Sequence, residues 1–134
     1  MNTSNKTQEH LRTIKNDLQY YREQIESIRT ALTSIGVDIS KFKNYPHGVQ
    51  SSPDSDALLK AMIRIDEFEN KLSEKTKEAT DFINQLHDMS KCRVLILYYI
   101  GGVKIVKIAK MMNCTPRRIN QIKKEAIVQL NELF

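Results

Sequence analysis

Hydrophobic residues recur along the first part of the chain at alternating steps of three and four positions. The series covers about three and a half heptads and consists of Leu11, Ile14, Leu18, Tyr21, Ile25, Ile28, Leu32 and Ile35. A stripe with this period lies on one narrow face of an α-helix and packs against another helix. The pattern predicts a helix over about residues 5–35, and Gly36 suits a left-handed cap at its end.

A second helix is expected over about residues 54–87, after a connector over residues 36–53 that contains two glycines and two prolines. Ser52 is a good N-cap and Pro53 suits a first helical turn. The apolar stripe weakens at Lys75 and Thr76, and its members are Leu58, Met62, Ile65, Phe68, Leu72, Ala79, Phe82, Ile83 and Leu86. This helix is long enough to run back along the first, so residues 1–87 are expected to form a coiled-coil-like antiparallel hairpin.

The rest of the chain, residues 88–134, has the pattern of three shorter helices. They are expected over about Ser90–Ile100, about Lys104–Met112, and from Thr115-Pro116 towards Leu133. Asn113 tolerates the left-handed backbone of a tight turn, while Thr115 suits an N-cap and Pro116 the first helical position. Two helices joined in this way are typical of a helix-turn-helix, which places its second helix in the major groove of DNA. The predicted fold is therefore all-α, a helical hairpin followed by a helix-turn-helix DNA-binding domain.

The last two helices have one face that suits a core and one that suits DNA. Ile108, Met112, Ile119 and Ile122 are spaced to be buried where the helices cross, Ala109 allows a close approach, and Cys114 is expected to fill the space beneath the turn. The opposite face of the last helix then carries Thr115, Arg117, Arg118, Asn120, Gln121 and Lys124. Arginine can bind guanine with two hydrogen bonds, and asparagine or glutamine can bind adenine in the same way.

These side chains divide into base readers and phosphate contacts. Base contacts are assigned to Arg117, Asn120, Gln121 and Lys124, and Arg118 is a candidate for the DNA backbone instead. Lysines suit phosphates, which position a protein on DNA without reading its sequence. The candidates for phosphate contact are Lys104, Lys107, Lys110, Lys123 and Lys124.

The distribution of charge agrees with this assignment. The net charge is +5, yet residues 1–87 carry 12 Lys/Arg and 13 Asp/Glu, whereas residues 88–134 carry 9 and 3. No acidic residue lies between Asp88 and Glu125. A basic segment that coincides with a DNA-reading motif is typical of a nucleic-acid-binding protein, although a basic run alone is more often a solvated helix face.

Other classes of function find little support in the sequence. Cys92 and Cys114 form no CxxC pair, and the three histidines have no ligand spacing, so neither a metal nor a cofactor is expected. There is no nucleophile–base pair or glycine-rich phosphate loop, so no enzyme is expected. The longest apolar run has seven residues and the N-terminus is polar, which favours a cytoplasmic protein that is not associated with a membrane.

Three segments together resemble region 4 of bacterial sigma factors: residues 94–102, 105–112 and 114–119. With the preceding helix and connector, residues 45–134 resemble small phage and prophage late transcription regulators of the ArpU/RinA type. The resemblance implies an activator of phage late genes that acts at promoters with host RNA polymerase. The chain departs from sigma modules in having Asn113 where the turn favours glycine, and in the basic residues of the helix before it.

The leading hypothesis is therefore a sequence-specific transcription regulator that binds double-stranded DNA. The stripe Leu11–Ile35 could hold a homodimer or a helical partner, but an intramolecular hairpin would use the same surface. One alternative is a small-terminase-like subunit that recognises DNA for phage packaging, although its usual order places the reader first. The other is a helical regulator that binds proteins and does not read DNA.

Overall fold

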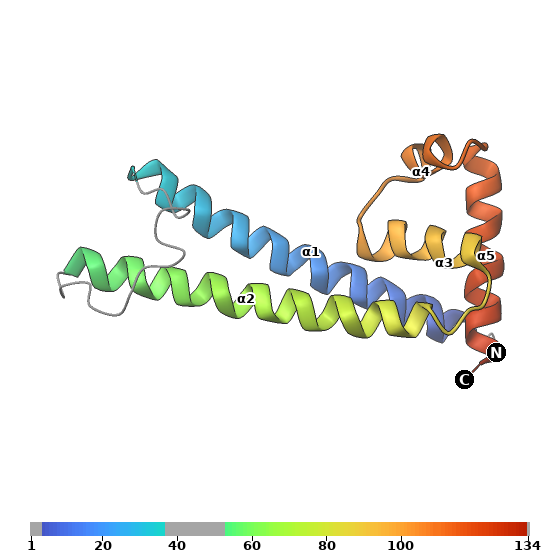
Figure 1. The fold of residues 1–134 in the computed structure, drawn as a ribbon, viewed down its shortest axis with the longest axis horizontal. Coiled ribbons are helices and arrows are strands. Elements are labelled where there is room, and N and C mark those ends of the chain that lie inside the picture. The colour runs from blue at the N-terminus through green and yellow to red at the C-terminus, as the bar shows by residue number, and fades with distance from the viewer. Residues whose placement is uncertain (1–3, 37–52, 134) are drawn as a thin grey trace. The chain divides into compact units, whose positions relative to one another are not determined.

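The computed structural model describes residues 4–36 and 53–133, and the regular structure within them is entirely helical (Figure 1). The predicted all-α class is confirmed for this part of the chain. The two long helices are α1 (Ser4–Ser34) and α2 (Pro53–Ile83). The shorter elements are α3 (Met89–Leu95), a π-helical turn η2 (Ile96–Ile100), α4 (Ile105–Met111) and α5 (Pro116–Glu132).

The chain divides into two compact units, through both of which α1 and α2 pass. The terminal unit consists of Met1–Gln19 and Glu74–Phe134, and the middle unit is Tyr20–Ser73. The start of α1 therefore belongs to the same compact unit as α3, α4 and α5. The domains predicted from the sequence, 1–87 and 88–134, stay a prediction, because compactness alone does not define an independently folding domain.

The stripe on α1 is buried over most of its length. Its buried members are Leu11, Ile14, Leu18, Ile25 and Leu32, while Ile35 is 73% exposed because it follows the last helical residue. Gly36 has a φ of 84°, and its N–H donates to the Thr33 carbonyl, which confirms the predicted left-handed cap. Tyr21 and Ile28 are only half-buried, and the dimer or partner contact expected through the stripe stays a prediction.

The middle unit is held together by apolar contacts between α1 and α2. Ile25 and Leu32 of α1 form one buried cluster with Ile65 of α2, and the half-buried residues around it are Ile28, Leu58, Ala61, Phe68 and Leu72. Arg29 donates to Glu69 at 2.8 Å, but both side chains are more than 40% exposed. An exposed ion pair contributes at most about 1 kcal/mol, so the buried stripe provides most of the stability here.

In the terminal unit, polar contacts accompany a core that includes Leu11, Ile14 and Ile83. Lys75, where the predicted stripe of α2 weakens, forms an ion pair with Asp17 at 3.6 Å. Thr7 is buried, and its hydroxyl donates to the Asn131 side chain at 2.6 Å, which joins the start of α1 to the end of α5. A buried hydroxyl without a partner would be costly, so this hydrogen bond helps to specify where α1 packs.

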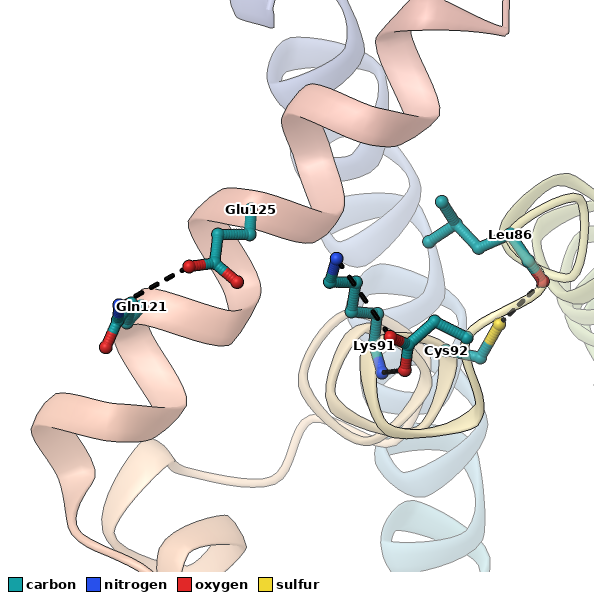
Figure 2. Close-up of polar contacts among 6 residues, drawn as sticks. Leu86, Lys91, Cys92, Gln121 and Glu125 are labelled. Carbon is teal, nitrogen blue, oxygen red and sulfur yellow. Dashed lines mark hydrogen bonds and ion pairs between the residues drawn. The ribbon is translucent and has the colours of Figure 1, made fainter.

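The second long helix ends at Ile83, earlier than the predicted end at residue 87. The chain leaves the helix in a tight turn, in which the Leu86 N–H donates to the Ile83 carbonyl at 3.0 Å. The Cys92 thiol also donates to the Leu86 carbonyl at 3.2 Å (Figure 2). Burial and then the charge of Asp88 raise the pKa of this thiol, so it stays protonated as a donor. The side chain of Leu86 is buried although the residue lies outside the helix.

The helix predicted over Ser90–Ile100 is a short α-helix that continues into a π-helical turn. Asp88 caps α3 by accepting from the Lys91 N–H at 3.1 Å. In η2 a backbone hydrogen bond joins residues five positions apart: the Gly101 N–H donates to the Ile96 carbonyl at 2.9 Å. A Cβ at Gly101 would lie 2.9 Å from the Leu97 carbonyl oxygen, so glycine is required there. The predicted end at Gly101-Gly102 is confirmed, and the π-helical turn is a correction.

Candidate nucleic-acid interface

The connection between α4 and α5 has the local geometry that its sequence predicts. Asn113 has a φ of 55°, in the left-handed region. The Thr115 hydroxyl accepts from the Arg118 N–H at 3.1 Å, and Pro116 occupies the first turn of α5. Because the cap and the proline account for two amide groups that have no partner within the helix, the start of α5 is well defined.

A compact core lies beneath this connection. Val94 of α3, Ile108 and Ala109 of α4, and Ile119 and Ile122 of α5 form one buried cluster. Both α3 and α4 pack against α5, and Figure 1 shows them along the same side of it. Met112 and Cys114 are half-buried against the cluster. The predicted core positions of the last two helices are therefore confirmed, including Cys114 beneath the turn.

The side of α5 that faces away from the core is polar and exposed. We call this surface the α5 outer face; it consists of Thr115, Arg117, Arg118, Asn120, Gln121, Lys124 and Glu125. Arg117, Gln121 and Lys124 follow one another at steps of four and three, so they form one row along the helix. Burial of the opposite side prevents α5 from rotating, and the row is held outward by the fold.

Exposed lysines on α4 extend the positive charge. Lys107 and Lys110 are exposed, as is Lys104 at the position before the helix. Within residues 4–36 and 53–133, none of these lysines forms an ion pair, and neither do Arg117, Arg118 and Lys124. Their charges are not neutralised inside the protein, so they can attract a polyanion.

Lys123 lies apart from the other candidate residues. It is half-buried on the side of α5 near Ile119 and Ile122, and its ammonium lies 4.1 Å from the centre of the Tyr98 ring. Lys15 of α1 lies 4.9 Å from the centre of the same ring. These are cation–π contacts, which hold long side chains against an aromatic surface. The structure therefore places Lys123 in an internal contact and not on the α5 outer face.

Tyr99 follows Tyr98 in η2, and the two rings meet edge to face at 4.9 Å. Burial, with a smaller effect of Tyr98, raises the pKa of Tyr99 to about 12, and the charge of Arg12 opposes this rise. The phenol therefore stays neutral at physiological pH. This aromatic pair connects the start of α1 with α5, which the sequence analysis did not detect because the residues are far apart in the chain.

Glu125 is a member of the α5 outer face to which the sequence analysis assigned no role. The Gln121 side-chain amide donates to the Glu125 carboxylate at 3.4 Å, and both residues are exposed (Figure 2). Residues four apart on a helix are neighbours, so the spacing was a signal that could have identified this contact. Glu125 also lines a shallow groove with Lys91, Lys124, Val128 and Gln129.

Two features of the described residues bear on other chemistries. Residues 4–36 and 53–133 contain no group of three or more His, Cys, Asp or Glu side chains that could hold a metal ion. Among the helices of the same ranges, none combines the length and the apolar character needed to cross a bilayer.

Comparison with known proteins gives no relative for this chain. No family model, no curated protein and no solved structure matches it.

Proposed function

We propose that this protein is a sequence-specific DNA-binding transcription regulator whose helix α5 enters the major groove. One observation carries the proposal: the α5 outer face is an exposed, basic and amide-rich surface on a helix whose opposite side is buried and whose start is capped. DNA readers need this combination, because side chains can select bases only if the helix that carries them is held rigidly.

The row on α5 contains the residue types that read base edges. Arg117 suits guanine, and Gln121 suits a base with an amino group, because their donors and acceptors match those base edges. The lysines of α4 would lie against phosphates, which fix the position of α5 without carrying sequence information. Lys123 is not included among the proposed DNA contacts, because its ammonium is held over the Tyr98 ring.

In this proposal α4, the turn and α5 act as a helix-turn-helix with α3 as its supporting helix, in the manner of sigma region 4. The long helices α1 and α2 form a coiled-coil-like hairpin that carries this module. The role as a phage late-gene activator working with host RNA polymerase follows from the ArpU/RinA resemblance, and it is part of the proposal. Support comes from the element order, in which α3, α4 and α5 follow the two long helices.

A site-selection experiment tests the proposal. The full chain selects duplexes from a random pool and from phage and host DNA, and the preferred sequence is then bound by Arg117→Ala and Gln121→Ala. Each substitution should cost about 1–3 kcal/mol of binding free energy on the preferred duplex, because it removes a bidentate base contact. Arg64→Ala, an exposed arginine of α2 in the middle unit, is the matched control and should bind as the unaltered chain does.

The possible results separate the parts of the proposal. Unchanged binding by both α5 variants would show that the α5 outer face does not read DNA. If the unaltered chain selects no sequence from any pool, the proposed function is wrong.

A further inference from the structure

Glu125 is the only acidic residue between Asp88 and Glu132, and it is exposed on the surface proposed to meet DNA. A carboxylate at this place repels phosphates, so it weakens the general attraction of the basic segment for DNA. The residue follows Gln121 by one helical turn and is adjacent in sequence to Lys124. Its position can therefore affect the base preference as well as the affinity for DNA.

The Glu125 carboxylate can accept more hydrogen bonds than it receives within the protein. Lys91 and Lys124 line the same groove, yet within the described ranges Glu125 forms no ion pair, and the Lys91 ammonium instead pairs with Asp88 at 4.0 Å. The contact that Glu125 does make is with Gln121, whose amide nitrogen donates to it at 3.4 Å (Figure 2). That hydrogen bond turns the donor end of Gln121 towards Glu125 and leaves the Gln121 oxygen available as an acceptor.

We propose that Gln121 and Glu125 act as one acceptor pair that selects a base with an exocyclic amino group, adenine or cytosine, at the position they contact. This inference rests on the proposed function, since it assigns a specificity to the same surface. In the major groove adenine N6 and cytosine N4 are donors, whereas guanine O6 and thymine O4 are acceptors. A guanine or thymine would place a carbonyl oxygen against the carboxylate, and this repulsion excludes those bases.

The negative charge of Glu125 also increases the difference in affinity between the preferred duplex and other duplexes. On a preferred duplex, the hydrogen bond from the amino group offsets the repulsion between Glu125 and the phosphates. On any other duplex the repulsion is not offset, so binding is weaker. Glu125 is therefore a specificity-determining residue, because it lowers affinity for most sequences and lowers it least for the preferred one.

The variant Glu125→Gln tests the proposal in the full chain. It keeps the size of the side chain but removes the charge and adds an amide donor, so guanine and thymine can be accepted. We expect the preference for adenine or cytosine at one position to fall by about 5- to 150-fold, the range that a wrong base pair costs at one position of a site. We also expect a scrambled duplex to be bound several-fold more tightly. Site selection and dissociation constants for both duplexes measure these changes.

Glu132→Gln is the matched control. It makes the same change of charge on the same helix, but at its last residue, about two turns beyond Glu125. It should raise the affinity for both duplexes by similar small factors and leave the base preference unaltered. Gln121→Ala in the Glu125→Gln background completes a double-mutant cycle, and the two substitutions should be non-additive because the residues act as one unit.

Each result bears on one conclusion. If the unaltered chain selects a sequence and Glu125→Gln keeps the same base preference, the acceptor pair is wrong while the proposed function stands. An equal loss of preference in Glu132→Gln would also overturn it, because the effect would then come from net charge alone. If the unaltered chain selects no sequence, the proposed function fails and the acceptor pair fails with it.

Discussion

At the scale of single residues, the surface that we propose to meet DNA depends on a few backbone contacts. Asn113 takes a left-handed conformation, and Thr115 accepts the Arg118 N–H, so the chain enters α5 in one defined direction. Arg118 itself lies on the α5 outer face, and the cap therefore acts on the same turn that presents candidate DNA contacts. The stability of this turn should be linked to the affinity for DNA.

Thr115→Ala tests this link. The loss of an N-cap hydrogen bond costs about 1 kcal/mol, so the melting temperature should fall by a few degrees, as measured by circular dichroism. Affinity for the selected duplex should also fall, because the first turn of α5 frays. Thr115→Ser keeps the hydroxyl and should retain both properties, and Thr13→Ala, an exposed position on α1, should change neither. An unaltered melting temperature in Thr115→Ala would show that the cap contributes no stability.

At the scale of helices, the burial of apolar stripes decides which surfaces remain free. The stripe on α1 was open to two interpretations in the sequence, a contact with another chain or a contact with α2. The structure buries Leu11 to Leu32 within the chain and leaves Ile35 exposed. On α5 the same principle applies, since burial of Ile119 and Ile122 leaves Arg117 and Gln121 on the outer face.

The contrast between Leu18→Ala and Ile35→Ala tests the extent of the buried stripe. Leu18 is fully buried, so its truncation should lower the free energy of unfolding by about 2–5 kcal/mol. Ile35 is largely exposed, so its truncation should change that free energy by less than about 0.5 kcal/mol. Urea titrations of both variants measure these differences. Equal destabilisation would contradict the end of the stripe at Leu32.

At the scale of the whole chain, charge is distributed so that one segment attracts polyanions. Residues 1–87 are almost neutral, and residues 88–134 carry the whole excess of lysine and arginine over acidic residues. The terminal unit contains this basic segment together with the start of α1. Any binding to DNA should therefore weaken steeply with added salt, because lysine–phosphate contacts release counterions.

Lys107→Ala and Lys110→Ala test the origin of this dependence. Each should reduce the slope of the logarithm of the affinity against the logarithm of the salt concentration by about 0.9, since each removes about one phosphate contact. The loss of affinity should be the same on preferred and scrambled duplexes, because phosphates carry no sequence information. Lys60→Ala on α2 is the matched control and should leave the slope unchanged. A loss confined to the preferred duplex would instead assign these lysines to bases.

The helices, the turn between α4 and α5 and the residues beneath that turn could be predicted from the order of amino acids. These features depend on contacts within a few residues, such as the cap at Thr115, or on a helical period that is visible in the order of apolar residues. The end of α2 at Ile83 and the π-helical turn η2 were not predicted. The first depends on the hydrogen bonds of a tight turn and the second on those of a π-helical turn. The sequence carries only a weak signal for either.

Contacts between side chains from distant parts of the chain depend on the packing of the helices in three dimensions. The Thr7 hydroxyl donates to the Asn131 side chain, and the ammonium groups of Lys15 and Lys123 both lie over the ring of Tyr98. No periodic pattern indicates such contacts, because they depend on how helices pack against one another and not on the order of residues within one helix. For the same reason the sequence placed Lys123 among the DNA contacts, whereas the packing of η2 and α1 beside α5 turns its ammonium towards the protein.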